Sequence, residues 1–290
     1  MDVTTFTDAA PFADVVRPVI ERHPAQSSIL ATVLDQAVNG HPLDDSLWLL
    51  ISDGAEPVAA AMHTPPWNLY LTPLQDDARV KAIEVLADVL VEADRDLPGV
   101  TASTEDARAF ADAWQQRAGG RPRLTLSELL YEIRDVPPPP DPAAVAGGPR
   151  IATEQDIELI ARWLDAFNLE AVPDREPIDG ERLVRQRLAR GWYVLWELPE
   201  QDGEPFEPVS VAGLSLAAGI ARVGPVYTPG LQRRRGYAGA VTAMATRLGF
   251  EQGASRCVLY ADVANPTANG IYQAIGYRLI DEAQMIGFRQ

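Results

Sequence analysis

The chain of 290 residues has few of the features that mark several common classes of protein. Its single cysteine, Cys257, excludes an internal disulfide framework and favours a reduced, cytoplasmic setting. Hydrophobic residues make up 47% of the sequence, yet no run approaches the ~18 apolar residues of a membrane helix. Met1 to Val3 lack the charged and apolar regions of a secretion signal. We therefore expect a cytoplasmic globular protein without a membrane partner.

Basic residues are also scarce, with 25 Lys and Arg against 41 Asp and Glu, for a formal net charge of −16. Proteins that bind nucleic acid need a basic face to neutralise phosphates. This chain has one short basic cluster, Arg233 to Arg235, so we expect no nucleic acid partner. The negative field is compatible with steering of amine-bearing substrates, and equally with a simple role in solubility.

Two common phosphate-binding motifs are missing, the Gly-Lys-Ser/Thr of Walker loops and the three-glycine Rossmann fingerprint. What is present is Val226-Tyr227-Thr228-Pro229, followed by Arg233-Arg234-Arg235-Gly236-Tyr237-Ala238. An apolar strand is predicted to pass into a helix here, and the unpaired N–H groups and positive dipole of a helix N-terminus favour an anion. Glycine lets a phosphate approach the backbone closely. The segment therefore predicts a site for a phosphate-bearing cofactor.

The sequence after this loop has a regular pattern of elements. Apolar residues at helical spacing are followed by a buried strand, by a helix that Asn265 caps and Pro266 begins, and by a last strand from Tyr277. The residues that carry the pattern are Val241, Met244, Ala245 and Leu248 in the first helix, 257–261 in the strand, and Ile271, Tyr272 and Ile275 in the second helix.

These residues resemble the GCN5-related N-acetyltransferases (GNAT). Arg233, Gly236 and Ala238 match the Arg/Gln-x-x-Gly-x-Gly/Ala loop of that family, and 265–277 resembles its second conserved motif. The resemblance implies an α/β (α+β) fold with a mixed, mostly antiparallel central sheet flanked by helices, and acetyl-CoA as acyl donor. The cofactor-binding residues that it implies are Val226, Tyr227, Arg233, Arg234, Arg235, Gly236, Tyr237, Ala238, Asn265 and Asn269.

The resemblance also implies which residues take part in the chemical steps. Val226 N–H or a neighbour would stabilise the oxyanion, and Tyr272 occupies the position of the general acid, because a phenol of pKa ~10 can donate to a thiolate of pKa ~8.5. A core tyrosine beside Ile271 and Ile275 is the alternative. Many members carry a Glu on the strand before the loop, whereas 214–226 contains no acid. The candidate bases are Asp165, Glu170, Glu197 and the carboxylate of Gln290; none stands out, and we carry Glu170 forward as the catalytic candidate.

The chain divides at 136–149, where a run rich in Pro, Ala and Gly predicts a semi-rigid linker. Residues 150–290 then read β-α-α-β-β-β-α-β-α-β, which resembles a complete acetyltransferase domain. Residues 1–135 resemble a weakened copy of the same plan, in which Leu71 to Asp77 replaces the glycine loop. That segment has no glycine, and Asp76 and Asp77 would repel a pyrophosphate. We expect a degenerate N-terminal domain without cofactor, in which His63 has a structural role more readily than a substrate contact.

Together these observations predict an acetyl-CoA-dependent N-acetyltransferase that acts on a primary amine, either a small molecule or a peptide. No metal site is expected, and the protein would be a monomer or a homodimer. A non-catalytic acyl-CoA-binding or regulatory module remains the alternative, because the strand before the loop carries no glutamate.

Overall fold

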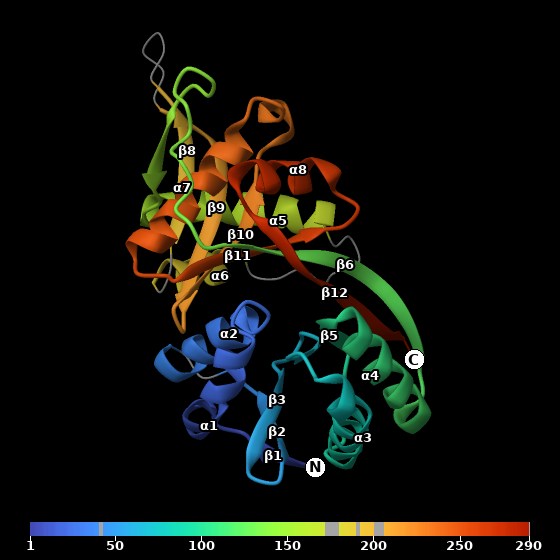
Figure 1. The fold of residues 1–290 in the computed structure, drawn as a ribbon. Helices are drawn as coiled ribbons and strands as arrows, with labels where there is room; N and C mark the ends of the chain where they lie inside the picture. Colours follow the sequence, from blue (N-terminus) through green and yellow to red (C-terminus); the bar gives the residue numbers. More distant parts are fainter. Residues whose placement is uncertain (41–42, 172–179, 190–191, 200–205, 290) are drawn as a thin grey trace. The chain divides into compact units, whose positions relative to one another are not determined.

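The computed structural model describes residues 1–40, 43–171, 180–189, 192–199 and 206–289 (Figure 1). The chain forms two compact units. The first comprises Met1–Leu130, Tyr260–Asn265 and Leu279–Gln290, and the second comprises Tyr131–Leu259 and Pro266–Arg278. These bounds differ from the continuous division expected at the linker, because the last strand pairs with the first unit, from Ala283 opposite Ser103 to Gly287 opposite Gly99.

The first unit contains a sheet and four helices. Its strands follow the order β1-β2-β3-β4-β5-β12-β6. The elements are β1 (Asp2–Phe6), α1 (Ala9–Arg22), α2 (Ser28–Asn39), β2 (Leu47–Asp53), β3 (Glu56–His63), β4 (Leu69–Leu71), α3 (Asp76–Glu92), β5 (Gly99–Ser103), α4 (Thr104–Ala118), β6 (Arg121–Ile133, which enters the second unit at Tyr131) and β12 (Arg278–Arg289).

Local sequence explains the hairpin turn of this unit and the starts of two of its helices. Strands β2 and β3 form a hairpin, and Gly54 takes the left-handed conformation that its turn requires, with φ +60°. Side-chain caps begin two helices, Asp8 for α1 and Ser103 for α4. Helices α1 and α2 lie on one side of the hairpin and α3 and α4 on the other (Figure 1).

The second unit has the strand order β11-β10-β9-β8-β7. Its elements follow the order predicted for 150–290. They are β7 (Gly148–Ile151), a 3-10 turn η1 (Glu154–Asp156), α5 (Ile157–Ala171), α6 (Gly180–Leu188), β8 (Trp192–Leu198), β9 (Glu207–Ala217), β10 (Ile220–Tyr227), a 3-10 turn η2 (Gly230–Gln232), α7 (Tyr237–Glu251), β11 (Arg256–Asp262) and α8 (Pro266–Ile275).

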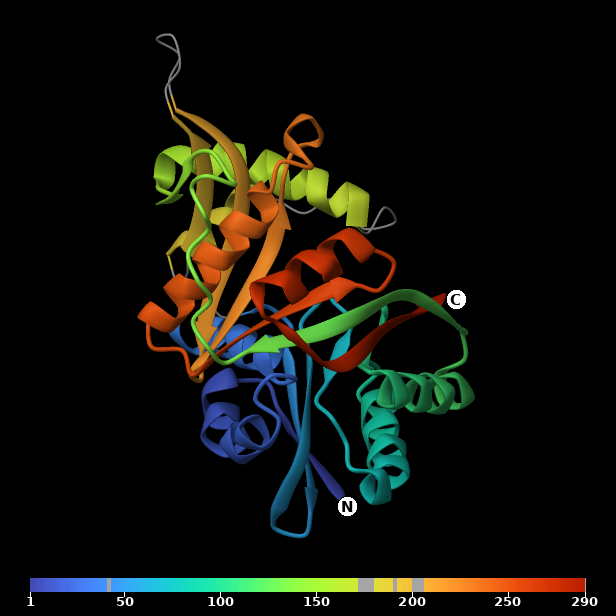
Figure 2. The same ribbon diagram turned by 45° about the horizontal axis from the view of Figure 1, so that its top comes forward.

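Helix α7 packs on one face of β8, β9 and β10, and α5 and α6 lie on the opposite face (Figure 2). Ile157, Ile160 and Leu164 have the spacing of one helix face and are buried in a core cluster with Val211. Thr153 caps η1, and the Asp156 carboxylate accepts a hydrogen bond from Thr153 N at 2.7 Å.

Some elements were not expected. Strand β1, helices α1 and α2 and the long strand β6 were not predicted from the sequence. The acid-free stretch 214–226 spans the end of β9, a turn at Ala218 and Gly219, and most of β10. The loop expected at 203–205, the last residue of the helix expected at 181–190 and the Gln290 carboxylate lie outside the described residues. Among the described helices, none has the length and apolar character needed to cross a membrane.

Candidate active site

The strand β10 is irregular before it reaches the candidate anion loop. It pairs with β9 in antiparallel fashion, with a bulge between Val223 and Val226, where Gly224 has φ +137°. Its parallel ladder with β11 runs from Ile220 to Arg222, opposite Arg256 to Val258. A bulge redirects backbone groups of a strand and is frequent beside functional sites. Here it places Val226 and Tyr227 just before the loop.

The loop itself has an unusual backbone. Arg234 has φ +66° although it is not glycine, and Gly236 has φ +86° and is the N-cap of α7. A left-handed arginine is costly and occurs where the surrounding structure requires it. Left-handed residues at 234 and 236 turn successive N–H groups in the manner of anion-binding backbone nests.

The end of α7 has the electrostatics of an anion site. The N–H groups of its first turn have no acceptor within the helix, and the dipole is positive there. Arg233, Arg234 and Arg235 are all exposed, and Tyr237 is buried under the first turn. Ala238 is half-buried. Exposed guanidinium groups and the N–H groups of a helix first turn are donors of the kind that suits a pyrophosphate.

Arg233 and Glu170 meet at this loop. The Arg233 Nη2 atom lies 2.9 and 2.7 Å from the two carboxylate oxygens of Glu170, at the end of α5. Its Nε donates to the Thr228 carbonyl at 2.9 Å, and its guanidinium lies 5.7 Å from the centre of the Tyr227 ring. The structure thus brings together a predicted cofactor residue and the predicted catalytic carboxylate.

A buried hydroxyl pair supports the end of β10, and the sequence analysis did not find it. Ser210 of β9 donates to the Tyr227 carbonyl at 3.0 Å and lies 2.8 Å from the Thr228 hydroxyl. Both hydroxyl-bearing residues are buried. Their hydrogen bonds fix the chain where it leaves the sheet. No local pattern predicts this pair, because its members are 18 residues apart.

Tyr272 lies in a cluster of three tyrosines. Its ring makes edge contacts with Tyr131 and Tyr277, with ring centroids 6.3 and 6.4 Å away. Burial raises the pKa of Tyr272 to about 12, so the phenol stays protonated at neutral pH. The neighbouring Ile271 packs against Gly239, where an added Cβ would lie 3.4 Å from Ile271 Cγ2. Helix α8 therefore meets α7 at Gly239 through Ile271, the residue before Tyr272.

Four other predicted residues, two for the cofactor and two candidate bases, differ in burial and in the groups that they contact. Asn269 is buried in α8, and Asn265 is exposed directly before that helix. Among the alternative bases, Glu197 is held by Arg150 at 2.7 Å. The Asp165 carboxylate on α5 faces Gly180 of α6, where an added Cβ would lie 3.0 Å from its Oδ1 atom.

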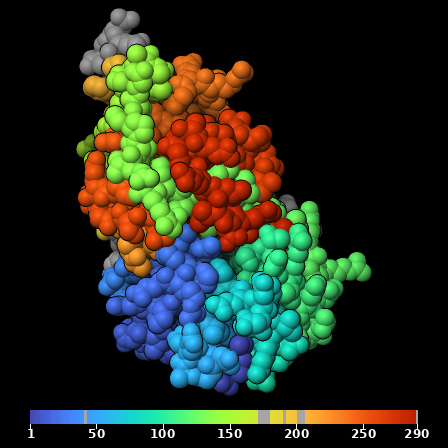
Figure 3. All heavy atoms as spheres, viewed as in Figure 1, coloured from blue at the N-terminus to red at the C-terminus, as the bar shows by residue number. Residues whose placement is uncertain are grey.

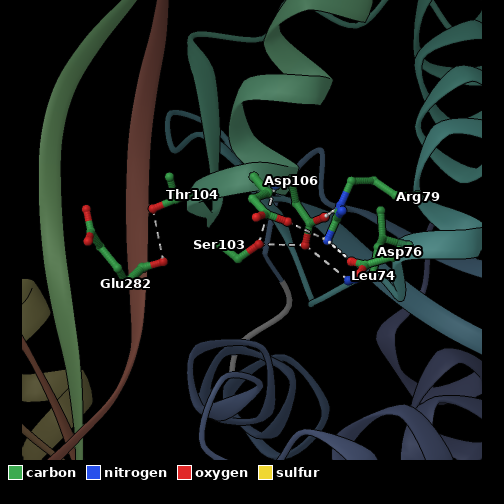
Figure 4. A network of polar contacts seen from close by, with 8 residues as sticks. Leu74, Asp76, Arg79, Ser103, Thr104, Asp106 and Glu282 are labelled. Carbon is green, nitrogen blue, oxygen red and sulfur yellow. Dashed lines mark hydrogen bonds and ion pairs between the residues drawn. The ribbon is translucent and has the colours of Figure 1, made fainter.

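The loop between β4 and α3 of the first unit is tied to side chains of α3 and α4 (Figure 4). The buried Asp106 carboxylate accepts hydrogen bonds from Leu74 N at 3.0 Å, from Ser103 Oγ at 2.7 Å and from Arg79 Nε at 2.7 Å. Arg79 also binds Asp76 at 2.9 Å. The Leu74 N–H of this loop thus already donates a hydrogen bond to a carboxylate of the same unit.

Comparisons with known proteins bear on the fold. No family model and no curated protein matches the sequence. Solved structures do match. A Drosophila protein solved as a structural genomics target has a TM-score of 0.71 at 10% identity, and the match covers 99% of this chain and 98% of that one.

Two matching structures are described as GCN5-related N-acetyltransferases. The one from Sphaerobacter thermophilus has a TM-score of 0.59 at 15% identity and covers 99% of this chain and 98% of its own. The one from Kribbella flavida has a TM-score of 0.55 at 20% identity and covers 91% and 96%. These likenesses confirm the expected fold class, a mixed and mostly antiparallel sheet flanked by helices. The chain has the fold of the GCN5-related N-acetyltransferases.

Proposed function

We propose that this protein is a GCN5-related N-acetyltransferase that transfers the acetyl group of acetyl-CoA to a primary amine. The observation that carries the proposal is the left-handed Gly236 at the N-cap of α7, directly after the bulged strand β10 and beside three exposed arginines. A helix N-terminus with a glycine cap and adjacent guanidinium groups suits a pyrophosphate better than any neutral ligand.

The second unit offers separate groups for each part of acetyl-CoA. The backbone N–H groups of 234–238 would hold the pyrophosphate, and one or two of Arg233, Arg234 and Arg235 would contact phosphate groups. Tyr227 and Asn269 would contact the cofactor along its length. Val226 N–H, just past the bulge, would stabilise the oxyanion that forms when an amine attacks the thioester.

Proton transfer falls to two side chains in this proposal. Tyr272 keeps its proton at neutral pH because burial raises its pKa to about 12, and it would donate to the departing thiolate. Glu170 would accept the proton of the amine. Its two oxygens are engaged by Arg233, so Glu170 can act as a base only when that ion pair opens. An amine that is already neutral at the working pH would need no strong base.

The first unit would be a degenerate acetyltransferase-like domain that binds no cofactor. Two observations support this part of the proposal. The Asp106 carboxylate takes the Leu74 N–H, a donor that an anion would need. The hollow lined by Tyr70, Leu71, Thr101 and Ala102 has a volume of about 20 Å³, which is room for about one water molecule.

A non-catalytic acyl-CoA-binding or regulatory module is the second candidate. It is favoured by the absence of any acidic residue on β10, Ile220–Tyr227, and by the engagement of both Glu170 oxygens. In this role the cofactor would bind at the same loop, but no acetyl transfer would follow.

Calorimetric titration with acetyl-CoA tests the proposed function. We expect one site per chain in the wild type and no binding in Gly236→Asp, which places a carboxylate at the anion site. Gly219→Asp is the matched control: this glycine also has positive φ (+73°) with open space around it, in the turn between β9 and β10. The control should bind normally. Two sites per chain would overturn the assignment of the first unit, and no binding by the wild type or by any variant that retains Gly236 would overturn the proposed function.

A further inference from the structure

The linker at 136–149 is not a free tether in the second unit. We call residues 137–146 the strap. The buried Pro137 accepts a hydrogen bond through its carbonyl from Arg247 Nη1 at 2.7 Å, in the C-terminal half of α7. Eight residues later, Val145 contacts Gly236, at the N-terminus of the same helix. The strap therefore runs along α7 over its surface (Figures 2 and 3).

Hydrogen bonds set the conformation of the strap near the loop. The Asp141 carbonyl accepts from Ala144 N at 3.0 Å and from Val145 N at 3.1 Å, which makes a turn. The next residue, Ala146, accepts through its carbonyl from Trp196 Nε1 at 2.9 Å. Val145 is thus fixed between a turn on one side and an anchor on the other.

Val145 is the residue of this region that turns inward. Its side chain is half-buried, whereas Asp141 to Ala144, Ala146 and Gly147 are exposed. A Cβ built on Gly236 would lie 2.9 Å from Val145 Cγ2, closer than real side chains approach. An apolar isopropyl group therefore fills the space that the glycine leaves open at the anion loop.

We propose that the strap is a lid on the cofactor site, which Val145 closes and which lifts before acetyl-CoA binds. The inference rests on the proposed function. An isopropyl group offers no hydrogen bond to a phosphate, and it occupies the side of Gly236 on which it lies, although Gly236 itself is exposed. Most residues of the strap are exposed, and the strap is held at Pro137, at the Asp141 turn and at Ala146, so it can open locally when these few hydrogen bonds break. The apparent affinity for cofactor is then reduced by the fraction of molecules in which the lid is closed.

Binding of acetyl-CoA to three variants tests the lid. Val145→Ala shortens the side chain over Gly236, and Arg247→Ala removes the anchor at the opposite end of α7. Both should tighten binding about 3- to 10-fold and speed association, because the open state becomes more populated. Val136→Ala makes the same chemical change at a residue that is 54% exposed, just before the strap, and should bind like the wild type.

Hydrogen exchange provides a second readout that needs no turnover. If the lid lifts, acetyl-CoA should increase exchange at the amides of Ala144 and Val145 in the wild type, since their bonds to Asp141 open. The lid is wrong if the wild type binds acetyl-CoA, both variants bind with unchanged or weaker affinity, and exchange in the wild type is unchanged or slower on binding. The proposed function would still stand in that case. Absence of binding in the wild type and in both lid variants would overturn both proposals. Binding by the lid variants alone would support the lid.

Discussion

Arg233 and Glu170 form an ion pair in which both carboxylate oxygens lie within hydrogen-bond distance of one guanidinium nitrogen, at 2.9 and 2.7 Å. The pair joins the end of α5 to the loop that begins α7. The two side chains are 45% and 53% exposed, so the pair contributes at most about 1 kcal/mol to stability. Removing it therefore probes function with little risk of unfolding.

Glu170→Gln should lower kcat about 100-fold at neutral pH if Glu170 accepts the proton of the amine, with little change in the KM for acetyl-CoA. The pH profile of kcat should lose its acidic limb. Glu158→Gln is the control, because Glu158 is an exposed residue of the same helix paired with Arg162. A normal kcat with a raised KM for acetyl-CoA would contradict the catalytic assignment and make Glu170 a positioning residue for Arg233.

Tyr272→Phe separates the enzyme from the non-catalytic module. Phenylalanine keeps the ring contacts with Tyr131 and Tyr277, so binding of acetyl-CoA should stay within about 2-fold of the wild type. Loss of the phenol should lower kcat about 100-fold or more. Tyr131→Phe removes only a hydroxyl that accepts from Gln273 and should leave kcat unchanged. Steady-state kinetics with an amine acceptor give the comparison, and normal turnover in Tyr272→Phe would rule out its role as general acid.

Gly236→Ala should destabilise the fold by about 2 kcal/mol in urea unfolding, because it combines a positive φ with a steric clash. Gly253→Ala measures the cost of the positive φ alone, since Gly253 has φ +92° and open space around it. Adding Val145→Ala to Gly236→Ala should restore the part due to the clash. A loss no larger than that of Gly253→Ala would mean that Val145 does not press on the loop.

Asp106→Ala should lower the free energy of unfolding by about 3 kcal/mol, because it leaves Leu74 N–H and the Arg79 guanidinium without their buried partner. Chemical denaturation measures this effect. Asp77→Ala, at an exposed position in the first turn of α3, should change stability by no more than about 0.5 kcal/mol. Equal effects of the two substitutions would contradict the structural role of Asp106.

His63 makes stability depend on pH. Burial and the nearby Arg95 guanidinium lower its pKa from 6.5 to about 4, and Arg95 Nη2 lies 3.1 Å from its Nδ1 atom. A lowered pKa means that the unfolded chain binds a proton that the folded chain does not. The contribution is fully present above pH 6.5 and is lost as pH falls towards 4, by about 3 kcal/mol in total.

Urea midpoints measured between pH 7.5 and 4.5 test this prediction. His63→Gln should flatten the fall in stability. His23→Gln should also flatten it, since burial lowers the pKa of His23, but by less. An unchanged profile in His63→Gln would show that other groups cause the pH dependence.

Most of the second unit was predictable from local sequence. The element order, the cap at Thr153 and the glycine at the start of α7 follow from apolar periodicity and from residues whose backbone preferences act over a few positions. The same is true of the β2–β3 hairpin, where Gly54 supplies the left-handed turn residue. The long strand β6 was missed because its burial changes along its length, from mostly exposed residues at its start to four buried residues at its end, so it shows no clear alternation.

The sequence by itself determined the order of helices and strands in the second unit, and it placed a glycine and three arginines at the N-terminus of α7. Only the tertiary structure decided which partners these residues meet. Glu170 and Arg233 are 63 residues apart, Val145 and Gly236 are further apart still, and Asp106 reaches Leu74 across 32 residues. Local preferences act through backbone dihedrals and short-range hydrogen bonds, so they cannot specify contacts that form only when the sheet brings distant segments together.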